Sequence, residues 1–503
     1  MQLLGIETEY GIIREDVPDM DAVNESMALV RAYSESPFLP TWDYQHENPH
    51  KDLRGFCVPS LQQDHEETQY AEQDAHRGHS FQETKSDLVL SNGARFYNDH
   101  THPEYSTPEC RSLIDIVAHD RAGEWIVQQA ADKRNQTISG APLQLYKNNT
   151  DFHGHSYGCH DNYLLPRSLS FEQLAEGLLP FLVSRQLFSG AGKVGREGQD
   201  IPYQQGPFQL SQRADFIETT LSVDTMHNRP IVNTRDEPHA DRTRYRRLHL
   251  IVGDANMCEY ATALKVGTTQ LVLDMIKQGA APELKLDNPV EAIKIFSQDT
   301  QLKAVVGRNR NGTISGLDLQ SAYLSVAQRM FAGVDEETDW ILQEWAHVLD
   351  CLQRDRLALI GYVDWITKQW LLETFREEEN LPWTAPWLAS LDLEYHNLHP
   401  DRGLFRGLEA EGKTYRLCPN NLVEAAMHTG PSDTRGGIRG WCVQRFGPQI
   451  TAIQWEHIHF KDRGSSVVLD LSHVLEPEDV QHVKQTLQQA QCPADFTQLL
   501  AGT

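Results

Sequence analysis

The stretch LLGIETEYGII, residues 3–13, indicates the fold because its side chains alternate between two faces. Successive side chains of a strand point to opposite sides. One side carries the mostly apolar residues Leu4, Ile6, Thr8, Tyr10 and Ile12. The other side carries Glu7 and Glu9 among glycines. Two carboxylates on one face are either a strand end exposed to water or one wall of a metal site.

Three later segments alternate in the same way, namely ARFYND (94–99), HSYGCHDNY (155–163) and YRRLHLI (245–251). If these strands pair side by side, residues directly opposite one another share a face, and the polar sides merge. The predicted polar face carries Glu7, Glu9, Arg95, Tyr97, Asp99, His160, Arg247 and His249. Glu104 is expected just past a turn, in HTHPEY (100–105).

The side chains of this face are of the types that bind hard cations and phosphate. Carboxylates with an imidazole or phenolic oxygen suit Mg²⁺ or Mn²⁺, and neighbouring arginines suit the phosphates. Burying so many ionisable groups without an ion is energetically expensive. A lone Glu or His on a strand is more often solvated, or satisfied by a neighbour, than a ligand, so the metal–nucleotide hypothesis depends on the four strands forming one sheet.

Composition and missing motifs exclude several classes of protein. The 503 residues carry a net charge of −26, which argues against a nucleic-acid partner. The chain has no G-x-x-x-x-G-K-[ST] loop, no strand-linked G-x-G-x-x-G and no G-x-S-x-G elbow, and GAGKVG (190–195) fits a loop between a helix and a strand. The eight cysteines form no C-x-x-C pair, and no apolar run reaches about 20 residues. A strand-like run with acids directly after Met1 predicts that there is no signal peptide. We therefore expect a cytoplasmic protein without a membrane partner.

Strand patterns early in the chain and helical patterns later predict an α+β fold with an antiparallel sheet. The stretch 338–353 has a Trp/Ile/Leu stripe at helical spacing. Residues 58–87 are polar with few aliphatics, which predicts a long mobile loop. A smaller unit is expected from about residue 420, so the predicted domains are 1–419 and 420–503.

Seven long motifs resemble the enzymes that modify proteins with prokaryotic ubiquitin-like protein (Pup). They are GIETEYG, NGARFYNDHTHPEYSTPEC, YKNNTD, SYGCHDNYL, FLVSRQL, NTRDEPHADRTRYRRLHLIVGDANM and LKVGTTQLVLDM. The likeness extends from residue 1 to about residue 470. It implies a glutamine-synthetase-like carboxylate–amine ligase fold, in which a curved antiparallel sheet cradles ATP and Mg²⁺ beside a small C-terminal domain.

This family has a ligase branch and a deamidase/depupylase branch. WDYQHENPHKDLRGF with the polar insert after it, DHTHPEYS, and FREEENLPWTAP (375–386) resemble the deamidase/depupylase branch. HDRAGEW (119–125) and SYGCHDNY are closer to the ligases. In the latter, Asp161 replaces the usual Glu, on the face opposite His160. The balance favours the deamidase/depupylase branch.

The resemblance also assigns roles to the polar residues. It makes Asp99 the catalytic carboxylate. The expected magnesium ligands, or close supports of them, are Glu7, Tyr97 and Glu104, with His160, His249 and Glu9 as additions. The expected nucleotide contacts are Arg95, Thr107 and Trp455, the last from the C-terminal domain. Arg247 is expected to face the phosphates because of strand alternation alone.

The implied reaction is amide hydrolysis at the C-terminal residue of Pup or a Pup-like modifier. It converts Gln to Glu or releases the modifier from a substrate lysine, with Asp99 as nucleophile or as base. ATP, or ADP with phosphate, would be a cofactor that is not consumed in each turnover. The implied partners are the modifier, its protein conjugates and a bacterial proteasome. Two alternatives stay open: an ATP-consuming ligase, and a nucleotide-bound protein that sequesters the modifier without chemistry.

Overall fold

A central sheet of eight strands forms the frame of the molecule. The computed structural model describes residues 2–496 except 16, 18–19, 35–41, 46, 63–76, 199–200, 310–311 and 463. The sheet has the strand order β10-β11-β12-β7-β1-β5-β4-β3. Its strands are β1 (Leu4–Glu9), β3 (Leu88–Val89), β4 (Arg95–Asp99), β5 (His102–Ser106), β7 (Cys159–Pro166), β10 (Thr219–Ser222), β11 (Pro230–Asn233) and β12 (Tyr245–Leu250).

Strand pairing confirms the predicted sheet. The four strands predicted to carry the polar face, β1, β4, β7 and β12, all belong to it. Pairing is antiparallel except between β10 and β11, which run parallel. Glu104 lies within β5, opposite Tyr97, and follows the turn at His100 and Thr101 as predicted.

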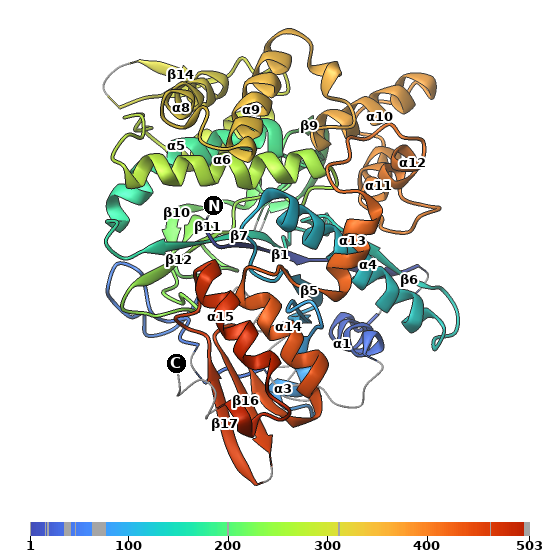
Figure 1. Ribbon diagram of the computed structural model, residues 1–503. Helices are drawn as coiled ribbons and strands as arrows, with labels where there is room; N and C mark the ends of the chain where they lie inside the picture. The colour runs from blue at the N-terminus through green and yellow to red at the C-terminus, as the bar shows by residue number, and fades with distance from the viewer. Residues whose placement is uncertain are drawn as a thin grey trace.

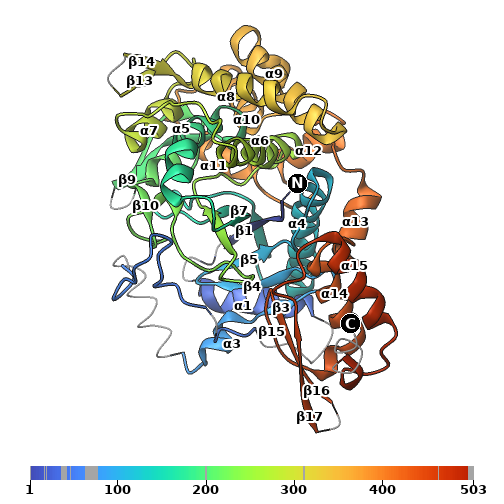
Figure 2. The ribbon, with the colours of Figure 1, turned by 60° about the vertical axis from the view of Figure 1, so that its left-hand side comes forward.

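Helices cover the apolar side of this sheet. The first group of helices is α1 (Ala22–Tyr33), α3 (Phe81–Lys85), α4 (Leu113–Asn135), α5 (Phe171–Ser189), α6 (Glu259–Lys277) and α7 (Pro289–Gln298). Helix α4 packs on β1 and β5, α5 packs on β11, and α6 packs on both α4 and α5. Figures 1 and 2 both show α5 and α6 above β7 and β1. The alternating burial of side chains along β1 follows from this arrangement, because Ile6 and Thr8 lie beneath the helices and are each 1% exposed.

A second group of helices extends the apolar core away from the sheet. It comprises α8 (Gly316–Phe331), α9 (Glu336–Arg354), α10 (Asp364–Glu378), α11 (Pro386–Tyr395), α12 (Leu404–Ala410) and α13 (Asn420–His428). Helix α9 begins where Asp335 accepts a hydrogen bond from the Thr338 amide, a cap that contributes about 1 kcal/mol. The buried Ile341, Trp345 and Leu352 lie along one side of α9, which confirms the predicted helical stripe.

Short two-stranded sheets complete the large core. They pair β2 (Gly11–Arg14) with β6 (Leu143–Tyr146), β8 (Lys193–Gly198) with β9 (Ile201–Gln209), and β13 (Val305–Gly307) with β14 (Thr313–Ser315). Strand β6 therefore lies outside the central sheet. Among the described residues, none of the helices combines the length and hydropathy needed to cross a membrane.

The C-terminal elements form a second apolar core on the other side of the sheet (Figure 1). They are α14 (Arg435–Phe446), β15 (Ile450–Ile453), β16 (His457–Asp462), β17 (Ser465–Asp470) and α15 (Pro477–Gln488). Helix α13 instead contributes Val423 and Met427 to the large core. The two-domain division at 419/420 stays a prediction.

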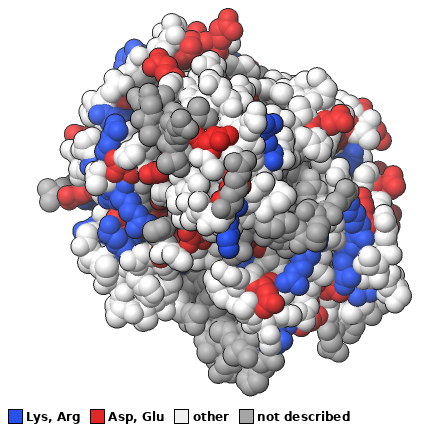
Figure 3. Space-filling model, turned by 60° about the horizontal axis from the view of Figure 1, so that its bottom comes forward, with Lys and Arg blue, Asp and Glu red and all other residues white. Residues whose placement is uncertain are grey.

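Acidic and basic side chains are interspersed over the described part of the face in Figure 3.

The polar segment 58–87 contains a helix near its C-terminal end, which its composition does not indicate. Residues 63–76 of this predicted loop lie outside the described residues. Residues 81–85 form α3, so the loop prediction is wrong there. A capping box between Ser80 and Glu83 begins this helix. Asn98 of β4 donates a 3.0 Å hydrogen bond to the Thr84 carbonyl oxygen and holds the helix against the sheet.

The turn between β3 and β4 fits against α14 with no room for a side chain. Gly93 has φ +80°, and a Cβ there would lie 2.1 Å from the Gly436 carbonyl oxygen. We expect Gly93→Ala to lower the free energy of unfolding for two reasons, backbone strain at positive φ and a steric clash with Gly436. The clash should add about 1–3 kcal/mol to the effect of the strain. Gly333→Ala is the matched control, because Gly333 also has φ +80° but has nothing within 4 Å of an added Cβ. Equal melting temperatures of the two variants would contradict this account of the contact.

Candidate metal and nucleotide site

Strand register brings the predicted polar residues onto one face of the sheet. Glu7 lies opposite His160 on β7 and Ser106 on β5, and Ser106 in turn lies opposite Arg95. Glu9 lies opposite Glu104, which lies opposite Tyr97. Since direct cross-strand neighbours share a face, the alternation argument is confirmed for these strands.

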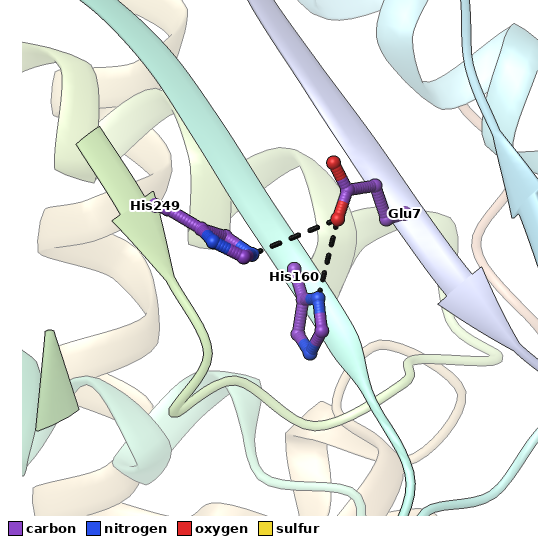
Figure 4. Close-up of side chains that lie close together, drawn as sticks. All are labelled: Glu7, His160 and His249. Carbon is purple, nitrogen blue, oxygen red and sulfur yellow. Dashed lines mark hydrogen bonds and ion pairs between the residues drawn. The ribbon is translucent and has the colours of Figure 1, made fainter. Parts of the chain in front are cut away.

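Glu7, His160 and His249 form the first of two groups with potential metal ligands (Figure 4). His160 Nδ1 donates to Glu7 Oε2 at 3.2 Å, and His249 Nε2 lies 3.6 Å from the same oxygen. Asn162 Nδ2 and Arg247 Nη1 each donate to Glu7 Oε1 at 3.2 Å. Burial would raise the pKa of Glu7, but the bond from His160 and the charge of Arg247 outweigh burial and lower it. Glu7 is therefore an anion at neutral pH.

His249 is the orphaned member of this group. Within the described structure, neither of its ring nitrogens has a hydrogen-bond partner, and the residue is 5% exposed. Burial, followed by the charge of Arg247, holds its pKa well below the ordinary value. A neutral imidazole with an unshared electron pair beside a carboxylate has the chemistry of a metal ligand.

Glu9, Asp99 and Glu104 form the second group, with one oxygen of each lying within 4.8 Å of the others. Burial, followed by the charges of Asp99, Glu7 and Glu9, raises the pKa of Glu104 well above its ordinary value. A hydrogen bond with Tyr97 opposes that rise. Three carboxylates this close repel one another unless a cation or a proton lies between them. This donor set fits Mg²⁺ or Mn²⁺.

Asp99 differs from its acidic neighbours because a lysine contacts it. Lys85 of α3 donates to Asp99 Oδ1, and the two side chains are 17% and 27% exposed. Burial would raise the pKa of Asp99, but the charge of Lys85 outweighs burial and lowers it. Asp99 therefore stays ionised, as a base or a nucleophile must be.

A cavity adjoins the first group between β1, the residues after β5 and the C-terminal core. Among its lining residues are Glu7, Thr107, His239, Arg247 and Trp455. Thr107 is fixed at the wall because its Oγ1 accepts a 3.1 Å hydrogen bond from the Ile6 amide. An aromatic ring, a hydroxyl and a cation around one cavity suit a base, a sugar and a phosphate.

Arginines from α14 position Trp455 over this cavity. Arg439 donates to the Trp455 carbonyl oxygen at 3.0 Å, and its guanidinium lies 4.7 Å from the ring centre. Arg439 also pairs with Glu109, and so does Arg435, which lines the cavity. Both arginines are buried and tie the two cores together.

Arg95 is held away from the cavity lining. Its guanidinium pairs with Asp87 and lies 3.8 Å from the Tyr97 ring centre and 4.1 Å from that of Trp42. Trp42 in turn packs edge-on against Trp455, with ring centres 5.2 Å apart. Arg95 thus connects β4 to the wall that Trp455 provides.

Several side chains of the site were missed by reasoning from sequence. Lys85 lies in the segment predicted as a polar loop, and Asn162 was not among the predicted site residues. The contacts of Glu7 with Asn162 and Arg247 follow from the pairing of β7 with β12, in which Leu164 lies opposite Arg247. The signal for Asn162 was its spacing of two residues from His160.

Comparison with solved structures gives the class of protein. The fold matches the Pup ligase PafA in its complex with Pup, with a TM-score of 0.77 and 28% identity over 100% of this chain and 94% of that chain. It also matches the PafA complex with ADP, with a TM-score of 0.72 and 31% identity over 86% of this chain and 96% of that chain. Both are enzymes of Pup modification, so the predicted fold class is confirmed.

The family follows from the sequence comparisons. The chain belongs to the family described as Pup-ligase protein, whose model matches residues 2–459. A depupylase of Acidothermus cellulolyticus is 42% identical over 91% of both chains. A Pup deamidase/depupylase of Mycobacterium tuberculosis is 41% identical over 93% of this chain and 92% of the relative. A Pup–protein ligase of Acidimicrobium ferrooxidans is 42% identical over 76% of this chain and 86% of the relative.

Proposed function

We propose that this chain is a hydrolase that deamidates the C-terminal Gln of Pup, or a Pup-like modifier, and cleaves the modifier from substrate lysines. The observation that carries the proposal is the extent of the matches. Relatives named depupylase or Pup deamidase/depupylase match 91% to 93% of the chain, whereas the ligase relatives match 76% at similar identity. The ionised Asp99 on a face rich in potential metal ligands supports the same reaction.

In this proposal Mg²⁺ is held by two sets of ligands. Glu7, His160 and His249 form one set, and Glu9 and Glu104 form the other, with Tyr97 supporting Glu104. The ion would neutralise negative charge that develops on the carbonyl oxygen and on the phosphate. The buried, mutually repelling carboxylates of the second set support this assignment because a bound cation relieves that repulsion.

Asp99 acts on the side-chain amide of the modifier's terminal residue. It either attacks the carbonyl carbon or takes a proton from the attacking group, and both routes need the ionised carboxylate. The amide C–N bond then breaks, and the ammonia or lysine amine leaves with a proton that comes from water. The oxygen of that water ends on the new carboxylate, either because the water attacked directly or because it hydrolysed the anhydride that Asp99 forms as nucleophile. The charge of Lys85, which keeps Asp99 ionised, supports both routes.

ATP, or ADP with phosphate, would occupy the cavity beside the first set of ligands. Thr107 and Trp455 would contact the nucleoside, Arg247 would face the phosphates, and Arg95 would support Trp455 through Trp42. The nucleotide acts here as a cofactor, without one ATP consumed in each turnover. The ADP complex of the related ligase PafA supports this occupant.

We expect Trp455→Ala to weaken ADP binding by roughly 5- to 150-fold, since stacking on an aromatic ring contributes about 1–3 kcal/mol per base. Isothermal titration of ADP with Mg²⁺ measures the dissociation constant. Trp387→Ala is the matched control, because Trp387 is 66% exposed. An unchanged dissociation constant for Trp455→Ala would remove Trp455 from the nucleotide site.

The ligase is the second candidate, because both solved structures reported above are ligase complexes. One assay separates the two reactions. Purified protein is incubated with ATP, Mg²⁺, free modifier and a preformed modifier–protein conjugate, while ADP and conjugate are followed together. The hydrolase is expected to remove conjugate with far less than one ADP per bond. Growth of conjugate with one ADP per bond would overturn the proposal in favour of the ligase.

A further inference from the structure

The geometry around Asp99 points to a second function for Lys85, and this inference rests on the proposed role of Asp99. We propose that Lys85 is a positioning residue that keeps Asp99 out of the metal site and so leaves it free for hydrolysis. Asp99 belongs by position to the Glu9–Asp99–Glu104 group, in which each oxygen lies within 4.8 Å of the others. A cation bound by the other two carboxylates would draw Asp99 in as a third ligand.

Lys85 and the two glutamates approach Asp99 from opposite sides of β4. Strand β4 lies between β3 and β5 in the sheet, and β1 follows β5. Lys85 precedes β3, whose Leu88 lies opposite Phe96 of β4. Lys85 is the last residue of α3, which packs on β4, and its ammonium contacts Asp99 from that side. Glu104 on β5 and Glu9 on β1 lie on the other side, so the lysine and a cation would compete for the same carboxylate.

Lys85 is held firmly at this position by the contacts of α3. Asn98 donates to the Thr84 carbonyl oxygen, and Arg31 donates to that of Glu83 at 2.7 Å. Directly after the helix, Ser86 adopts a left-handed conformation with φ 51° and turns the chain into β3. The next residue, Asp87, pairs with Arg95 of β4. The residues on either side of Lys85 are thus tied to β4, the strand that carries Asp99.

A double-mutant cycle of Mn²⁺ binding tests this competition in the nucleotide-free full chain. The four proteins are wild type, Lys85→Met, Asp99→Asn and the double variant, titrated with Mn²⁺ by electron paramagnetic resonance. Lys85→Met should bind Mn²⁺ roughly tenfold more tightly, since a unit positive charge no longer holds the carboxylate. The tightening should largely disappear when Asp99 is Asn, because no third carboxylate is then available. Lys285→Met is the matched control, an exposed lysine paired with Glu176.

Activity gives the second readout. Lys85→Met should lower kcat for conjugate cleavage about tenfold or more with an unchanged KM, and Lys85→Arg should recover part of it. Unchanged Mn²⁺ affinity in Lys85→Met, or equal tightening with and without Asp99, would overturn the inference. Absence of cleavage by wild type would instead overturn the proposed function, while the Mn²⁺ cycle would still decide the role of Lys85.

Discussion

Asp99→Asn is expected to lower kcat for conjugate cleavage by about 10²- to 10⁴-fold, the range over which positioned acid–base groups act. The amide has nearly the shape of the carboxylate but neither attacks a carbonyl nor takes a proton at neutral pH. ADP affinity should stay close to the wild-type value, because Asp99 lies outside the lining of the cavity. Steady-state cleavage of a purified conjugate measures the loss.

The melting temperature of Asp99→Asn should remain near that of wild type. The substitution leaves Lys85 without its ion pair, but it also removes one of three crowded carboxylates. Asp350→Asn is the matched control, because Asp350 pairs with Arg354 on the exposed surface of α9. Wild-type cleavage by Asp99→Asn would remove Asp99 from the chemistry and with it the proposed mechanism.

Glu104→Gln is expected to raise the Mg²⁺ concentration needed for half-maximal activity by roughly 10- to 100-fold or more. Glu104 is 3% exposed and lies between Glu9 and Tyr97 across neighbouring strands, at the centre of the second group. A Mg²⁺ titration of the cleavage rate measures the change. Glu424→Gln, at an exposed position on α13, is the control. A wild-type Mg²⁺ requirement in Glu104→Gln would show that Glu104 is no ligand.

The same substitution should stabilise the protein when Mg²⁺ is absent. The pKa of Glu104 is raised by burial and by Asp99, Glu7 and Glu9, so the folded state favours its protonated form. The stability from that form is present at low pH and is lost as pH rises through the raised pKa. In EDTA, the melting temperature of wild type should therefore fall more steeply with rising pH than that of Glu104→Gln. Parallel profiles of the two proteins would contradict the assigned environment of Glu104.

Local alternation predicted the polar face because the two-residue period of a strand needs no knowledge of distant contacts. Glu7, Glu9, His160 and His249 come together because β1, β7 and β12 pair with one another. Glu104 was missed as a strand residue because Pro103 and the preceding histidines favour a turn, whereas pairing with both β1 and β4 extends the chain.

Sequence reasoning did not predict the contacts of Arg95 and Lys85, because these contacts join separate segments of the chain. Arg95 is held by Asp87 and Trp42, and nothing in ARFYND indicates either partner. Lys85 lies on a five-residue helix, which is too short to show an amphipathic period and follows a polar stretch. Polar composition therefore predicted a loop where a capping box and the hydrogen bond from Asn98 support a helix.

The central claim is that this chain releases the modifier by hydrolysis. The most direct test is one time course with a purified Pup–protein conjugate, Mg²⁺ and ATP, in which the masses of both products are measured. The account predicts intact free modifier and intact unmodified protein with wild type, and unchanged conjugate with Asp99→Asn. A conjugate that persists with wild type, or is released equally by Asp99→Asn, would contradict it.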